Sequence, residues 1–296
     1  MVLHLTAQRR GKLVSFLRRE LGLSSSLVKR LKWRGAFLVN GETAHTDRMV
    51  EVGEEITVVL SEDAPDYPAE DGALDILYED DAILALDKPA GILMHPSFHR
   101  NTGTLANFVA GYYARSGQAC AVHPVSRLDR DTFGVVLLAK NAHVHGLLMD
   151  AQRRGDLRKT YQALTWGCPD PPEGIWDAPL GRVPGESLLR RVDPAGKIAR
   201  TQYRVLETQG GLARLELHPL TGRTHQLRVH CAHAGCPILG DRQYGSQGAQ
   251  MGFSGQQLLA RSLLLIHPLT EAPLSLESRR SLPPLSRILL EKEFAR

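Results

Sequence analysis

The sequence has few of the features that mark exported, membrane-embedded or metal-dependent proteins. Its 296 residues include four cysteines, none in a C-x-x-C pair, which is too few for a disulfide framework and fits a reducing compartment. No stretch near the start looks like a secretory signal, and no later run approaches the roughly 18 apolar residues of a membrane span. A glycine-rich phosphate loop and a metal-ligand pattern are also missing. We therefore expect a soluble, cytoplasmic, monomeric protein that uses no cofactor, metal or membrane.

Charge is spread unevenly along the chain, although the net charge is only +4. Residues 1–50 hold ten Lys or Arg and three Asp or Glu, whereas residues 51–90 hold one Lys and thirteen Asp or Glu. The rest of the chain is again basic. A solvated charged surface is the ordinary explanation of such clusters, but a basic head and a basic body favour a polyanionic partner such as nucleic acid.

The first 60 residues predict two short helices followed by a hairpin. The apolar spacing over 12–21 is that of an amphipathic helix, and a second helix is expected to begin after Ser24 and to end at Gly35. Asn40-Gly41 predicts a type I′ turn between two strands, and 55–60 predicts a further strand. The second helix carries its cations outward, and these are Lys29, Arg30, Lys32 and Arg34.

An acidic, proline-containing stretch over 61–73 predicts a linker, and 74–296 then predicts one larger domain. Short apolar runs alternate there with helical patterns over 105–115 and 142–153, so the fold class is mixed α+β. The strands are expected at 83–86, 135–139, 160–165, 201–206 and 213–217.

A charged cluster, R-L-D-R-D-T, stands immediately before the apolar strand that ends near Lys140. It closely resembles the R-L-D-x-x-T-S-G signature of the RluA-type pseudouridine synthases. The resemblance implies that Asp129 is the catalytic aspartate and that Arg127 enters the space left by a flipped base, with a phosphate-binding arginine as the alternative for Arg127. Ser126 and Phe133 depart from the usual histidine and serine, which affects expected packing and RNA contacts more than the nucleophile. A lone aspartate at this position would otherwise suit a turn that caps backbone N–H groups.

Two further segments resemble motifs of the same family, in the same order. The segment 158–164, RKTYQAL, resembles the second motif and implies that Tyr161 lies against the target uracil, whereas a tyrosine of the hydrophobic core is the alternative. The segment 220–245 resembles the third motif and implies that Arg228 pairs with the catalytic aspartate. The KPAG sequence of 88–91 also matches the family in position. Within the third motif we expect a helix capped by Thr224 and stopped by Gly235.

The head, over about residues 12–60, resembles the S4 RNA-binding module. This resemblance implies that the cations of its second helix contact RNA backbone, whereas a solvated helix face is the alternative. The whole chain thus resembles an enzyme with an S4-like α/β module on residues 1–60 and a catalytic domain built on a mainly antiparallel sheet.

The implied reaction is the isomerisation of uridine to pseudouridine in structured RNA, with ribosomal RNA of the large subunit favoured over tRNA by analogy. A non-catalytic RNA-binding or ribosome-assembly protein with the same fold is the alternative, and its mark would be loss of the three motif residues. A metal site built from the histidines of the third motif is disfavoured, because His225 and His230 lie about 140° apart on a helix.

Overall fold

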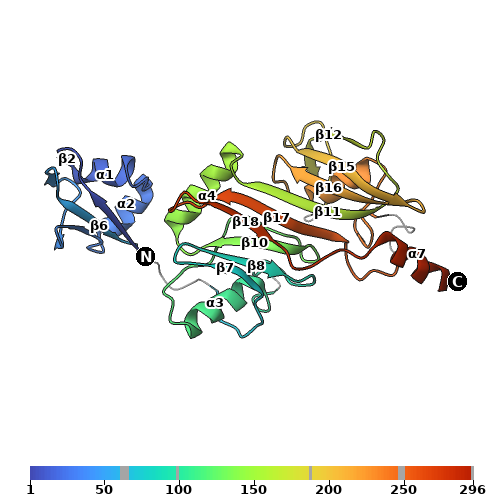
Figure 1. Ribbon diagram of the computed structural model, residues 1–296, viewed down its shortest axis with the longest axis horizontal. Helices are drawn as coiled ribbons and strands as arrows, with labels where there is room; N and C mark the ends of the chain where they lie inside the picture. Colours follow the sequence, from blue (N-terminus) through green and yellow to red (C-terminus); the bar gives the residue numbers. More distant parts are fainter. Residues whose placement is uncertain (61–66, 98–99, 187–188, 246–250, 295–296) are drawn as a thin grey trace.

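The computed structural model describes residues 1–60, 67–97, 100–186, 189–245 and 251–294 (Figure 1). A four-stranded sheet organises the N-terminal module, and a ten-stranded sheet extends through most of the remaining chain. Two short two-stranded ladders accompany them. In the ranges described, no helix combines the length and apolar character needed to cross a membrane.

The N-terminal module packs two helices on an antiparallel sheet of order β1-β6-β3-β4. Ser24 caps the second helix by accepting a hydrogen bond from the Leu27 N–H at 3.2 Å, as predicted, but that helix ends at Lys32, before Gly35. The elements are β1 (Val2–Thr6), β2 (Gly11–Lys12), α1 (Leu13–Arg19), α2 (Ser25–Lys32), β3 (Phe37–Val39), β4 (Glu42–Thr43), β5 (Met49–Val50) and β6 (Glu55–Val59).

The hairpin turn of this module has the predicted geometry. Asn40 and Gly41 have φ angles of 52° and 82°, the two positive values that a type I′ turn requires. Strand β1 has no counterpart in the prediction. Its five residues alternate between partly buried and exposed positions, and pairing with β6 stabilises them. This pairing joins segments far apart in the sequence, so the local pattern does not predict it.

The large sheet is mixed and mainly antiparallel, which confirms the predicted α+β class. Its order is β12-β15-β16-β11-β17-β10-β8-β7, with β18 beside β17 and β9 beside β10. Its strands are β7 (Ile76–Glu79), β8 (Ile83–Lys88), β9 (His123–Pro124), β10 (Phe133–Ala139), β11 (Arg158–Trp166), β12 (Glu173–Asp177), β15 (Arg200–Gln209), β16 (Leu212–Pro219), β17 (Leu258–Ile266) and β18 (Pro273–Glu277). The ladder of β13 (Leu180–Arg182) and β14 (Arg190–Val192) lies outside this sheet.

Both faces of the central strands are buried. On β8, Leu84 and Leu86 pack with helix α3 (Leu105–Arg115), whereas Ile83 and Ala85 pack with helix α4 (Ala142–Arg154). This explains why β8 reads as a nearly continuous apolar run instead of an alternating one. Helix α5 (Gln226–His233) carries Arg228, and helix α7 (Leu285–Phe294) lies near the C-terminus (Figure 1).

Part of the segment that composition assigns to a linker packs against α3. Asn107 donates from Nδ2 to the Pro68 carbonyl at 3.0 Å, and the Gly103 N–H donates to the Glu70 carboxylate at 2.7 Å. A Cβ atom at Gly111 would lie 2.0 Å from the Glu70 carbonyl oxygen, so a glycine is needed for this close approach. Residues 61–66 of the same segment lie outside the described ranges.

Candidate active site

The loop that carries the R-L-D-R-D-T sequence is fixed by a buried lysine. Lys88, at the end of β8, has no exposed surface and donates from Nζ to the carbonyl oxygens of Pro89, Arg130 and Thr132, each at 2.9 Å. All three hydrogens of its ammonium group are therefore used in hydrogen bonds to backbone carbonyls. Burial lowers the pKa of Lys88 to about 8, although the charges of Asp131 and Asp129 oppose that shift.

Gly134 sets the point at which this loop enters the sheet. Its φ of 109° lies in the region that favours glycine, and a Cβ atom there would lie 2.2 Å from the Ala260 carbonyl oxygen. Strands β10 and β17 can therefore run parallel and close together directly after the loop. Gly134 is thus a point of close packing between these two strands.

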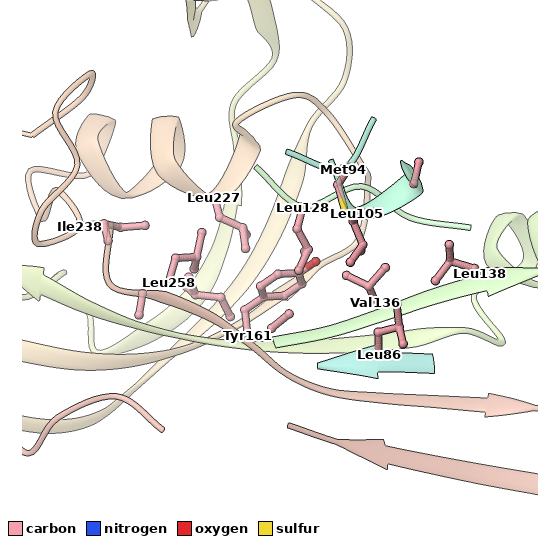
Figure 2. Close-up of a cluster of buried hydrophobic side chains, with 14 of the residues drawn as sticks. Leu86, Met94, Leu105, Leu128, Val136, Leu138, Tyr161, Leu227, Ile238 and Leu258 are labelled. Atoms are coloured by element: carbon pink, nitrogen blue, oxygen red, sulfur yellow. The ribbon is translucent and has the colours of Figure 1, made fainter. Parts of the chain in front are cut away.

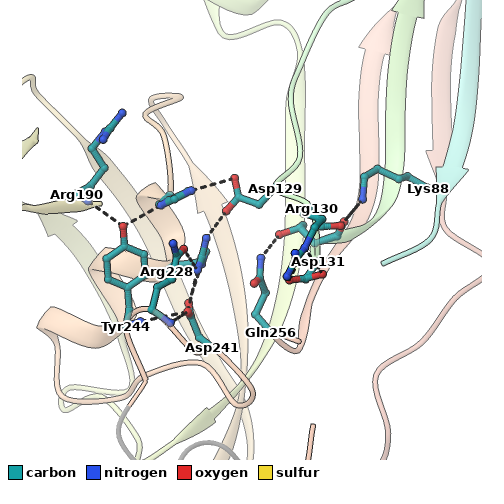
Figure 3. Close-up of polar contacts among 12 residues, drawn as sticks. Lys88, Asp129, Arg130, Asp131, Arg190, Arg228, Asp241, Tyr244 and Gln256 are labelled. Atoms are coloured by element: carbon teal, nitrogen blue, oxygen red, sulfur yellow. Dashed lines mark hydrogen bonds and ion pairs between the residues drawn. The ribbon is translucent and has the colours of Figure 1, made fainter. Parts of the chain in front are cut away.

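Asp129 meets Arg228 across the site. Nη1 of Arg228 donates to Oδ2 of Asp129 at 3.0 Å (Figure 3). On its other side the guanidinium is held by the buried Asp241, with Nε to Oδ2 at 2.7 Å and Nη2 to Oδ1 at 2.8 Å. Nη2 also donates to Oε1 of Gln243 at 2.7 Å. The arginine on α5 is therefore oriented before any substrate arrives.

The electrostatics keep this arginine charged. Burial lowers the pKa of Arg228, but the hydrogen bonds and negative charges of Asp241 and Asp129 outweigh it and raise the pKa above its usual value. The Asp129 side chain is 27% exposed, compared with 6% for Arg228. Asp129 is thus the member of the pair that a reactant can reach.

His225 approaches Asp129 from the start of α5. Its Nε2 lies 3.9 Å from Oδ1 of Asp129, and its Nδ1 lies 2.8 Å from the Tyr244 hydroxyl. That hydroxyl accepts a hydrogen bond from the Arg190 backbone N–H at 2.9 Å (Figure 3). Burial lowers the pKa of His225, and the charge of Asp129 opposes this shift. A neutral imidazole therefore faces the carboxylate near neutral pH.

The start of α5 corrects one prediction. The residue that precedes the helix is His225, with a left-handed φ of 56°, so Thr224 is not the N-cap. Instead, Oε1 of Gln226 accepts hydrogen bonds from the Arg223 N–H at 3.0 Å and the Thr221 hydroxyl at 2.8 Å, which holds the preceding turn. The predicted stop at Gly235 is confirmed by its φ of 75°.

Tyr161 lies on β11 within the core cluster that also contains Leu128, the residue before Asp129. Figure 2 shows its hydroxyl directed toward Leu128. The side chain is 8% exposed. Burial, and then the negative charge of Asp129, raise the pKa of the Tyr161 hydroxyl, which therefore stays protonated at neutral pH.

The residues that the motifs single out occupy different places. Asp129 and Arg228 are in contact, and the negative charge of Asp129 contributes, after burial, to the raised pKa of Tyr161. Arg127 is exposed, and its charge, after burial, lowers the pKa of His95. The four cations expected to contact RNA are all exposed in the N-terminal module; they are Lys29, Arg30, Lys32 and Arg34. The first three lie on α2, and Arg34 lies beyond its end.

Four residues around Asp129 had no role in the prediction: Lys88, His225, Asp241 and Tyr244. All four lie in segments whose sequence resembles family motifs, but the sequence does not show which residues they contact. In the described part of the chain, no group of three or more His, Cys, Asp or Glu side chains is placed to hold a metal ion. His230 instead pairs through Nδ1 with the Thr201 hydroxyl at 2.9 Å and through Nε2 with the Ala178 carbonyl at 3.0 Å.

Comparison with known proteins places this chain in a family. The family model for RNA pseudouridylate synthase matches residues 82–233. The chain is 36% identical over 262 residues to YhcT of Bacillus subtilis, described as an uncharacterized RNA pseudouridine synthase, with 88% of this chain and 86% of that protein covered. It is also 36% identical over 261 residues to ribosomal large subunit pseudouridine synthase D of Vibrio parahaemolyticus, with 83% and 80% covered.

A solved structure agrees with these sequence matches. The human RNA pseudouridylate synthase domain containing 4 protein is similar in fold with a TM-score of 0.57 and 28% identity, over 74% of this chain and 92% of that chain. The chain belongs to the RNA pseudouridylate synthase family. It is an RNA pseudouridine synthase, an isomerase that acts on uridine in RNA.

Proposed function

We propose that Asp129 is the nucleophile of this isomerase, that Arg228 is its charge partner and that Tyr161 contacts the target uracil. The reaction breaks the N1–C1′ bond and joins C5 to C1′, so no electrons or groups are exchanged with another compound and no cofactor is required. A carboxylate can hold the intermediate covalently while the base turns. Attack at C6 of the uracil and attack at C1′ of the ribose both fit this assignment.

The observation that carries the proposal is the guanidinium that meets Asp129 at 3.0 Å while Asp241 clamps its other edge. A fixed guanidinium beside the attacking carboxylate orients it through a charge-assisted hydrogen bond. The neighbouring carboxylate of Asp131 instead pairs with the exposed Arg130 at 2.9 Å. This difference in partners favours Asp129 over Asp131 as the reacting group.

The target uridine has to leave its stack, at a cost of a few kcal/mol. Contact with the ring of Tyr161 offsets a large part of this, because base stacking on an aromatic side chain contributes roughly 1–3 kcal/mol. Arg127 is exposed and stands two residues before Asp129. In the proposed complex it occupies the space that the base has left.

The proposed substrate is large-subunit ribosomal RNA rather than tRNA, as the name of the Vibrio relative suggests for that protein. Residues 1–60 would serve as an S4-like RNA-binding domain, and 74–296 as the catalytic domain. Residues 61–73 would form the acidic linker between them, of which Pro68 and Glu70 contact α3 and the loop that precedes it. The enzyme would act as a monomer in the cytoplasm, with the exposed cations of its head on RNA phosphates; these are Lys29, Arg30, Lys32 and Arg34.

Substitution of the carboxylate tests the proposal. We expect purified Asp129→Asn to form no pseudouridine while its RNA affinity stays within a few-fold of wild type, because phosphate contacts elsewhere supply most of the binding. Asp131→Asn is the matched control and is expected to keep most of its activity. Pseudouridine formation by Asp129→Asn at a rate similar to that of Asp131→Asn would overturn the assignment.

A second experiment identifies the substrate. Pseudouridines are mapped in total RNA from cells with and without the protein, and from cells that express only Asp129→Asn. We expect one or more large-subunit rRNA positions to lose the modification both in cells without the protein and in cells that express only Asp129→Asn. Losses confined to tRNA would contradict the proposed substrate but leave the catalytic assignment intact.

A further inference from the structure

Trp33, at the C-terminal end of α2, has the most exposed large apolar side chain of residues 1–60, with 85% of its surface accessible. The next most exposed is Val52 at 66%. The other two tryptophans, Trp166 and Trp176, are partly buried. Trp33 lies outside the core cluster of its own module, so its ring contributes little to the packing of the fold.

The chain segment that contains Trp33 is basic. The sequence has no acidic residue between Glu20 and Glu42, whereas four exposed cations stand in that interval. Nζ of Lys32 lies 5.7 Å from the centroid of the indole ring. A single exposed apolar residue is common on protein surfaces. An exposed indole among cations, however, combines the two components of single-stranded nucleic acid sites, which are an aromatic face for a base and positive charge for the phosphates.

We propose that Trp33 is a stacking platform for an unpaired nucleobase, with the neighbouring cations on the phosphates around that nucleotide. This inference rests on the proposed RNA-binding role of residues 1–60 and deepens it. Phosphate contacts alone attract duplex and single-stranded RNA alike, whereas stacking needs a base that is free of its own stack. The module would therefore favour RNA that has an unpaired nucleotide beside a helix.

The chemistry of the indole sets how selective this contact is. Every base has a π face, so stacking tolerates sequence and selects for structure instead. The indole N–H can donate one hydrogen bond but the ring has no strong acceptor, which limits readout of base edges. We therefore assign Trp33 to recognition of RNA shape near the target, and not to the choice of a particular base.

The test uses the full chain with two labelled RNAs of equal nucleotide number: a hairpin with a single-stranded flank and a blunt duplex. We expect Trp33→Ala to weaken binding to the flanked hairpin about tenfold and to leave duplex binding within about twofold. Trp33→Phe, which keeps an aromatic face, should stay within about threefold on both RNAs. Thermal unfolding of the variants should match wild type, since the side chain is exposed.

Lys29→Ala serves as the contrasting variant. It removes a charge but no ring, so it should weaken binding to both RNAs by a similar factor. It should also reduce the slope of log affinity against log salt concentration by about one. Trp33→Ala should leave that slope unchanged. This difference separates stacking from a general loss of charge attraction.

Three results would overturn the inference in distinguishable ways. If Trp33→Ala binds both RNAs like wild type while deletion of residues 1–60 weakens them, the module binds RNA without stacking on Trp33. If the deletion itself leaves RNA affinity unchanged at every salt concentration, the proposed role of the module fails and the stacking site fails with it. Indole emission that responds to anionic phospholipid vesicles but not to RNA would likewise reject a nucleobase as the ligand.

Discussion

The Nε2 atom of His225 lies 3.9 Å from Oδ1 of Asp129, the carboxylate oxygen opposite the one that Arg228 holds. The Tyr244 hydroxyl accepts from the Arg190 N–H, so it can donate its own hydrogen to Nδ1 of His225. That arrangement leaves the imidazole hydrogen on Nε2, directed at Asp129. The contact is longer than a hydrogen bond, and active-site contacts of this kind often shorten when substrate binds.

A matched pair of substitutions tests this relationship. Asn tolerates the left-handed backbone of His225 and can keep a polar atom near Tyr244, but it removes the group that faces Asp129. Gln places an amide where Nε2 lies. We expect His225→Asn to lower kcat about tenfold or more with little change in KM, and His225→Gln to retain more activity. Single-turnover kinetics on the same RNA measures both, and equal kcat values for the two variants would contradict a role for Nε2.

Resemblance to short family motifs named the proposed site residues one at a time. Asp129, Tyr161 and Arg228 each stand in a short motif, and the helix that became α3 was predicted over the same residues that it occupies. The contact between Asp129 and Arg228 spans 99 residues and depends on the order β11-β17-β10 in the sheet. No local pattern contains that order.

The supporting residues were out of reach for a related physical reason. Lys88 donates hydrogen bonds to backbone carbonyls, which every residue has and which therefore leave no sequence pattern. The sequence also does not show that this lysine is fully buried. Asp241 follows Arg228 by 13 residues, too far for a helical pair. The predicted start of α5 was wrong for a similar reason. His225 has a left-handed conformation before the helix and contacts Tyr244, a residue outside the helix.

Asp241→Asn is expected to damage both the fold and the reaction. Asp241 is 1% exposed and accepts two hydrogen bonds from Arg228, so the amide would leave a buried guanidinium with half of its charge compensation. Breaking one side of a buried ion pair costs about 3–5 kcal/mol. We expect this loss in urea unfolding, together with a fall in kcat of about 100-fold as Arg228 loses its orientation.

Asp177→Asn is the control for that substitution. Asp177 pairs with Arg200 at 2.8 Å, but both side chains are about half exposed. Such surface pairs contribute roughly 0–1 kcal/mol, so stability and kcat should hardly change. Similar losses of kcat in the two variants would show that the buried clamp on Arg228 has no special role.

Lys88→Met should loosen the loop that presents Asp129. It leaves the carbonyls of Pro89, Arg130 and Thr132 without this donor, at about 1–3 kcal/mol for each buried carbonyl that finds no replacement. We expect lower stability and a kcat reduced at least tenfold in protein that circular dichroism shows to be folded. The control is Lys159→Met, because burial lowers the pKa of Lys159 to about 8 as well, yet its Nζ donates to the Gln152 side chain at 2.7 Å. Equal kcat for the two variants would argue against control of the loop by Lys88.

Stability is expected to fall as the solution becomes acidic, through histidines that are buried in the neutral form. Burial is the largest cause of a lowered pKa at five positions, namely His95, His143, His145, His225 and His230. Because the folded pKa lies below the unfolded value of about 6.5, the unfolded chain binds more protons once the pH drops past that value, and the free energy of unfolding decreases. Urea unfolding between pH 7.5 and 5 measures this slope. In His143→Leu, which removes a group whose pKa is shifted by burial alone, the slope should be shallower by up to about 1.4 kcal/mol per pH unit. An unfolding free energy that stays constant or rises toward pH 5 would contradict the assignment of neutral, buried imidazoles.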